Sequence, residues 1–65
     1  MPFITIEGPY IKDTDKKREL AKKITDVAQK VYGINKEHII VLIRENKPEN
    51  IGLAGKLIVD FDVGK

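Results

Sequence analysis

The apolar run at residues 39–43, Ile-Ile-Val-Leu-Ile, constrains the fold of this chain most strongly. Its β-branched residues favour a strand, and because successive side chains of a strand point to opposite sides, both faces of this strand are apolar. Strands of this kind are normally buried on both faces between layers of helices. The sequence offers one long helical segment, which can cover only one face. We therefore expect the other face to be covered by something outside this chain.

Chain length supports the same expectation. A domain of 65 residues buries only about 60% of the surface that its unfolded chain exposes, so its stability alone is marginal. We expect a single domain over residues 1–65. There is no Cys and His38 is the one His, which excludes disulfides and leaves few ligands for a transition metal. Self-association is the remaining source of burial, and the sequence predicts a homo-oligomer.

Charge and hydropathy narrow the range of partners. Twelve Lys and Arg against ten Asp and Glu give a net charge of +2, which by itself demands neither nucleic acid nor a membrane. The longest apolar run is far shorter than the ~20 residues that span a bilayer, and no leader segment opens the chain. We expect a cytoplasmic protein without a nucleic-acid or membrane partner.

Local patterns place the main elements. Residues 2–7 form a short β-branched and aromatic segment that ends at the breaker pair Gly8-Pro9. A helix follows, with Asp13 or Thr14 as its N-cap and Gly33 as the residue that ends it. Its apolar stripe has helical spacing and comprises Leu20, Ala21, Ile24, Val27, Ala28, Val31 and Tyr32. The crossover between the two strands is long, and it therefore predicts that they run parallel.

Shorter signals fill the rest of the chain. On the helix, Glu19–Lys23 and Asp26–Lys30 have the favourable spacing for ion pairs. Asn35 can cap a single turn through His38. Residues 46–50 are predicted to form a loop and residues 51–55 a turn or hairpin. The alternation over residues 57–62 predicts a short C-terminal strand, added either to the chain's own sheet or to a neighbour's.

Pro2 carries the chemistry that this sequence can support. Removal of Met1 leaves Pro2 as a secondary amine at the N-terminus, and burial beside cations lowers the pKa of such an amine below its usual value near ~8. The ring holds the nitrogen rigidly, which suits a base that must be oriented. The simpler interpretation is a proline that only starts a strand, where its missing N–H is tolerated.

The chain resembles the 4-oxalocrotonate tautomerase family from residue 2 to about residue 60. The resemblance consists of an initial Pro-Phe-Ile-Thr-Ile strand, the turn Glu7-Gly8, the Lys-rich helix from Asp15-Lys16-Lys17, the strand at 39–45, and the segment Ile51-Gly52-Leu53-Ala54-Gly55. It implies an α+β fold, in which a β-α-β protomer with parallel strands, a crossover helix and a short C-terminal hairpin pairs into dimers, usually three per hexamer. It also implies a tautomerase that acts on enol and keto forms of a small 2-oxo acid. Pro2 is then the general acid and base, and neither a metal nor an organic cofactor is needed.

Three positions depart from the family pattern. Lys12 stands where the best-known members have an arginine, which keeps the charge but loses the bidentate fork. Ile40 stands where they have a second arginine, and Arg44 on the same strand face is a candidate substitute in substrate binding. At about 13 Å along the strand it is too far for a simple exchange and is expected to serve a different part of the pocket. Ile51 takes the place of an aromatic residue and keeps an apolar wall. These departures argue against the family's usual dicarboxylate substrate.

Two alternatives to this function remain open at the level of sequence. The basic helix fits a small binding module, although the interleaved Glu19 and Asp26 favour a solvated face. The missing charge at Ile40 fits a tautomerase scaffold without the main activity. His38 as an acid or base, Tyr10 and Asn50 as hydrogen-bonding groups, and residues 52–56 as a phosphate loop are weaker candidates.

Overall fold

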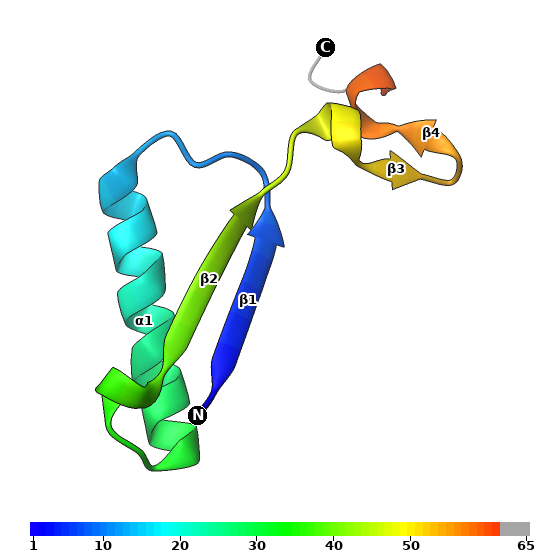
Figure 1. The fold of residues 1–65 in the computed structure, drawn as a ribbon. Coiled ribbons are helices and arrows are strands. Elements are labelled where there is room, and N and C mark those ends of the chain that lie inside the picture. The colour runs from blue at the N-terminus through cyan, green and yellow to red at the C-terminus, as the bar shows by residue number, and fades with distance from the viewer. Residues whose placement is uncertain (62–65) are drawn as a thin grey trace.

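The computed structural model describes residues 1–61. Two parallel strands, β1 (Phe3–Gly8) and β2 (Ile40–Glu45), are connected by helix α1 (Thr14–Tyr32) and lie side by side (Figure 1). An antiparallel hairpin of β3 (Gly52–Leu53) and β4 (Lys56–Leu57) follows, standing away from the sheet beyond the end of β2. The predicted β-α-β order with a C-terminal hairpin is confirmed.

The register of the two long strands fixes which residues are neighbours. Pairing runs from Phe3 with Ile40 to Gly8 with Glu45. The ladder continues past both ends, because Ile40 N–H donates to the Pro2 carbonyl at 3.1 Å and Asn46 N–H donates to the Gly8 carbonyl at 2.8 Å. Pro2 needs no N–H of its own at this position, which explains why a proline begins the strand.

The ends of α1 follow the sequence signals. The Asp13 side chain accepts a hydrogen bond from Asp15 N–H at 2.9 Å, so of the two predicted caps Asp13 is the one used. Gly33 adopts a left-handed conformation with φ of 65°, and its N–H donates to the Gln29 carbonyl at 2.8 Å. A short 3₁₀ turn at Lys36–His38 then leads into β2, although the Asn35 side chain makes no capping bond.

Burial is low for a folded chain. Within residues 1–61, Ala28 is the one buried hydrophobic residue, at 7% exposed. The radius of gyration is 15.4 Å, against about 11 Å for a compact chain of this length. The surface of 5524 Å² likewise exceeds the value of about 4,200 Å² for a compact monomer of this mass. A single copy therefore lacks a closed core.

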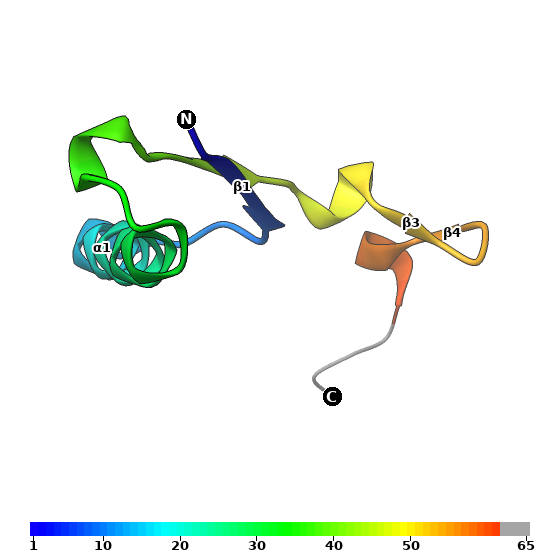
Figure 2. The same cartoon turned by 90° about the horizontal axis from the view of Figure 1, so that it is seen from below.

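The sheet shows where the missing core belongs. Side chains alternate along both strands, with one set turned toward α1 and the other exposed. Figure 2, in which α1 is seen end on, shows that the helix covers one side of the sheet. On the uncovered side Phe3 is 61% and Ile40 41% exposed. This agrees with the expectation that the second apolar face of residues 39–43 requires a cover from outside the chain.

Three local predictions differ in part from the structure. Of the C-terminal strand predicted over residues 57–62, Leu57 lies in β4, but Ile58–Asp60 form a 3₁₀ turn, in which Phe61 N–H donates to the Ile58 carbonyl at 3.1 Å. Asp62, the predicted end of this strand, lies outside the described residues. The predicted loop at 46–50 contains a 3₁₀ turn at Pro48–Asn50. Asp26 pairs with Lys22 at 3.1 Å rather than with Lys30, whereas the predicted pair Glu19–Lys23 forms at 2.9 Å.

Candidate active site

Pro2, the predicted general base, directly precedes β1. Its carbonyl is fixed by the hydrogen bond from Ile40 N–H, and the residue is half-buried. Met1 before it is 84% exposed. Because the backbone of Pro2 is anchored by the sheet, the nitrogen of a mature N-terminus would keep its orientation after Met1 is lost.

A hollow of about 350 Å³ adjoins this end of the strand. It is lined by Met1, Pro2, Tyr32 and Ile34. The side chains that line it are apolar apart from the Tyr32 hydroxyl. Tyr32 belongs to the last turn of α1 and Ile34 follows Gly33, so the left-handed turn at Gly33 brings the helix end next to the strand start. Sequence reasoning missed this pairing, because Tyr32 was assigned to the helix's apolar stripe.

The other predicted site residues lie at the opposite end of the sheet. Arg44 approaches Glu7 at 4.0 Å, at the carboxyl end of both strands. Ile51 lines a second hollow there, together with Glu7, Gly8, Asn46, Asn50 and Gly52. Lys12 is exposed in the loop between β1 and α1, which leaves from the same end.

Pro2 and these three residues do not meet within one chain. Six residue steps along the strand separate Pro2 from Gly8, which corresponds to about 20 Å. One chain therefore has Pro2 at one end of the sheet and the two cations with the apolar residue at the other. A site that contains all four residues requires at least two copies of the chain.

A carboxylate at the cation-bearing end is held by two donors. One oxygen of Glu45, Oε2, accepts a hydrogen bond from Ile11 N–H at 2.8 Å and forms an ion pair with Lys17 Nζ at 2.8 Å. The bond from Lys17, followed by that from Ile11, lowers the pKa of the Glu45 carboxyl below its ordinary value. Sequence reasoning missed this cluster because its members are far apart along the chain.

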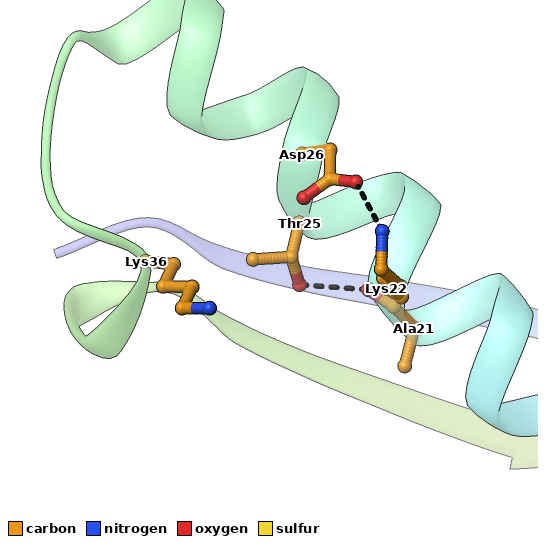
Figure 3. A pocket seen from close by; sticks show the side chains of 5 residues that line it. All are labelled: Ala21, Lys22, Thr25, Asp26 and Lys36. Atoms are coloured by element: carbon orange, nitrogen blue, oxygen red, sulfur yellow. Dashed lines mark hydrogen bonds and ion pairs between the residues drawn. The ribbon is translucent and has the colours of Figure 1, made fainter.

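Figure 3 shows a further hollow, between α1 and the segment that follows it. Ala21, Lys22, Thr25, Asp26 and Lys36 line it. Most of its polar groups already have partners, since Lys22 pairs with Asp26 and the Thr25 hydroxyl donates to the Ala21 carbonyl at 2.7 Å. Over the described part of the chain no group of three or more His, Cys, Asp or Glu side chains is arranged to hold a metal ion. The helices of residues 1–61 include none with the length and apolar character needed to cross a membrane.

Comparison with known proteins identifies the family. The sequence profile of the tautomerase enzymes matches residues 2–60. The chain is 29% identical over 62 residues to the 2-hydroxymuconate tautomerase of Bacillus subtilis, an alignment that covers 95% of this chain and all of that protein.

Solved structures agree with the sequence matches. The structure of YwhB, a homologue of 4-oxalocrotonate tautomerase, superposes with a TM-score of 0.87 at 28% identity, covering 94% of this chain and all of that one. DmpI from Archaeoglobus fulgidus gives a TM-score of 0.81 at 42% identity, covering 91% of this chain and all of that one. The matches span both strands, the helix and the hairpin, and they favour an enzyme over a small basic binding module. The chain belongs to the tautomerase family and is an isomerase of the β-α-β tautomerase fold.

Proposed function

We propose that this tautomerase interconverts the enol or dienol and keto forms of a small 2-oxo acid, with Pro2 as general base and acid after removal of Met1. The position of Pro2 carries the proposal. It directly follows an exposed Met1, it is anchored by β2, and it borders an apolar hollow. A small residue after the initiator methionine permits its removal.

The surroundings of Pro2 suit a neutral amine. An ammonium loses hydration in an apolar hollow, so partial burial lowers the pKa of an N-terminal amine toward neutrality. A base of this kind exists in its reactive form at pH 7 and can still return the proton. The surrounding Tyr32 and Ile34 provide no negative charge that would oppose this effect.

The reaction needs only proton movement. The neutral Pro2 nitrogen accepts the proton of the enol hydroxyl, and the electrons of the O–H bond become the carbonyl of the 2-oxo acid. The π electrons of the C=C bond shift to a carbon of the conjugated chain, where they form a C–H bond with the proton that the ammonium returns, and the base is regenerated. No electron leaves the substrate, so the step requires neither a redox cofactor nor a metal.

The substrate carboxylate and the charge that develops on oxygen need cations. We propose that Lys12 and Arg44 supply them and that Ile51 forms an apolar wall, each reaching Pro2 from a neighbouring copy. The opposite placement of these residues and Pro2 in one protomer supports a shared site. A dimer-based homo-oligomer follows from this arrangement, and we infer a homohexamer of chains that are each a single domain over residues 1–65. A cytoplasmic location remains a prediction.

Intact mass and a Pro2→Ala variant test the function. We expect the purified protein to lack one methionine and to convert enols of 2-oxo acids to the keto form, followed by ultraviolet absorbance. Pro2→Ala keeps a free N-terminal amine but loses the secondary amine and the ring, and we expect it to lose about 100-fold or more in kcat. His38→Ala serves as the control, since His38 is an exposed side chain in the turn before β2. Retained Met1 or full activity of Pro2→Ala would overturn Pro2 as the base, and absence of turnover by the wild type would leave a scaffold without the main activity.

A further inference from the structure

The loop between β1 and α1 carries Lys12 and is anchored at its two ends. Its first residue follows Gly8, which the sheet holds, and its last is Asp13, which caps the helix. Between these ends, Pro9 has no N–H to donate. Lys12 itself is exposed. The position of its ammonium therefore depends on what fixes the middle of the loop.

Glu45 provides that fixation. It is the last residue of β2, and its Oε2 atom accepts from Ile11 N–H at 2.8 Å across 34 residues of sequence. Within residues 1–61 this is the hydrogen bond that ties the middle of the loop to the sheet. Ile11 directly precedes Lys12, so the bond also restricts where the Lys12 backbone can lie.

The same oxygen is tied to the helix. Lys17 Nζ lies 2.8 Å from Glu45 Oε2 and 5.7 Å from the centre of the Tyr10 ring. One carboxylate thus joins the end of β2, the middle of the loop and the first turns of α1. The side chains of Glu45 and Lys17 are only 24% and 31% exposed. Partly buried charge pairs are less screened by salt than fully exposed ones, and a carboxylate that accepts from both an ammonium and an amide makes strong hydrogen bonds.

We propose that Glu45 is a positioning residue, which holds the loop of residues 9–13 so that Lys12 is preorganised to bind the substrate carboxylate. Glu45 has this role only if Lys12 binds the substrate, as proposed above. A preorganised cation loses less conformational freedom when substrate binds. Loss of this preorganisation should therefore weaken binding of the acid without changing proton transfer at Pro2.

Two variants at the cluster and one control test this role. Glu45→Gln keeps an acceptor for Ile11 N–H but removes the charge, and Lys17→Met removes the ammonium while keeping the apolar stem. Glu19→Gln removes a carboxylate from another Lys pair on α1, at an exposed position away from the loop. Each protein is assayed with the enol of a 2-oxo acid and with the enol of its methyl ester, which lacks the carboxylate. Hydrogen exchange of the Ile11 and Lys12 amides is measured in parallel.

A positioning role has a specific kinetic signature. We expect Glu45→Gln to raise KM for the acid about tenfold, the factor that corresponds to one charge-assisted hydrogen bond, with kcat retained. KM for the ester should not change, and the Ile11 amide should exchange faster. Lys17→Met should shift the same quantities in the same direction, and Glu19→Gln should shift none of them.

Other outcomes overturn the inference. An unchanged KM for the acid in both cluster variants removes Glu45 from the site, and an equal loss for acid and ester reveals a general structural role. If Glu45→Gln fails to fold, Lys17→Met tests the positioning role in its place, because this variant keeps the Glu45 carboxylate. These results are distinct from failure of the proposed function, in which the wild-type protein turns over neither substrate or Pro2→Ala stays active. Absence of turnover by the wild type would overturn both, whereas an active Pro2→Ala variant would overturn the proposed base alone.

Discussion

At the scale of single residues, the contact between Pro2 and Ile40 determines the character of the proposed site. The backbone hydrogen bond between them places the Ile40 backbone beside the proposed base, and the Ile40 side chain lies with Phe3 on the uncovered face of the sheet. An apolar side chain at this position gives no charge-assisted contact to a substrate carboxylate. Arg44 lies on the same strand face, 4.0 Å from Glu7.

Substitution of Ile40 by a cation should therefore change substrate choice. We expect Ile40→Arg to raise kcat/KM for a 2-oxo diacid relative to a 2-oxo monoacid by about tenfold, the value of one added charge-assisted contact. The ratio of the two kcat/KM values measures the effect. Ile40→Leu keeps an apolar side chain of the same volume and should leave this ratio unchanged. An equal change for both acids in Ile40→Arg would show that the second carboxylate does not reach this position.

Glu45 predicts a pH dependence of stability. Lys17 and Ile11 lower its pKa in the folded state, so the unfolded chain binds the proton more readily in the acid range. Its stabilising effect is therefore fully present above the ordinary carboxyl pKa of about 4.3 and is lost as the pH falls through the lower folded value.

Urea unfolding of wild type and Glu45→Gln at a series of pH values measures this effect. The wild type should be the more stable protein at pH 7, and the difference should shrink progressively below pH 4. The control is Glu19→Gln, whose difference from wild type should vary less because its carboxylate is exposed. A difference between wild type and Glu45→Gln that stays constant with pH would contradict the role of the charge.

At the scale of elements, two turns depend on left-handed backbone. Gly33 ends α1 with φ of 65°, and a Cβ added there would meet no atom within 4 Å, so its substitution tests backbone strain alone. Gly33→Ala should lower the free energy of unfolding by about 1 kcal/mol. Gly33→Asn should lose less, because Asn tolerates this conformation. Denaturant unfolding of both variants checks the order, and equal stabilities would show that the turn relaxes.

In the hairpin, a substitution at a left-handed position should raise stability instead of lowering it. Its two-residue turn, Ala54-Gly55, has φ of 55° and 82°, as a type I′ turn requires. Alanine is strained in a left-handed conformation, whereas Asn-Gly is the preferred pair for a type I′ turn. Ala54→Asn should therefore raise the free energy of unfolding by up to about 1 kcal/mol, and Gly55→Ala should lower it. Thermal unfolding midpoints that do not move in either variant would show that the hairpin is folded independently of the rest.

Elements were predictable from sequence where a local cause defines them. The cap at Asp13, the glycine at 33 and the apolar stripe between them fix α1 by interactions within a few residues. The strand predicted over 57–62 ends after Leu57, because the chain turns at Ile58–Asp60 instead of continuing the ladder with β3. The Glu45 cluster and the Tyr32 hollow depend on contacts between distant segments, for which one sequence contains no local signal.

At the scale of the whole molecule, one copy is open and elongated. Its principal extents are 44 × 25 × 15 Å, and the hairpin stands apart from the sheet (Figure 1). Apolar side chains on the hairpin and the uncovered sheet face are exposed, including Leu53 at 58% and Phe3 at 61%. Exposed apolar surface of this extent marks an interaction surface. The separation of Pro2 from Lys12 and Arg44 supports the proposal that a second copy completes the site.

Assembly and stability should therefore be linked. For an oligomer that buries these surfaces, the thermal midpoint falls as the protein is diluted, because dissociation draws the equilibrium toward unfolded chains. Leu53→Lys places a charge in the proposed contact, and we expect smaller assemblies, a lower midpoint and loss of turnover together. Glu37→Lys, a change at an exposed position of the turn before β2, should alter none of these. Native mass spectrometry, thermal unfolding and enol turnover of the same samples measure the three quantities. A monomer that keeps its midpoint on dilution and remains active would show that one chain forms the site alone, which its geometry opposes.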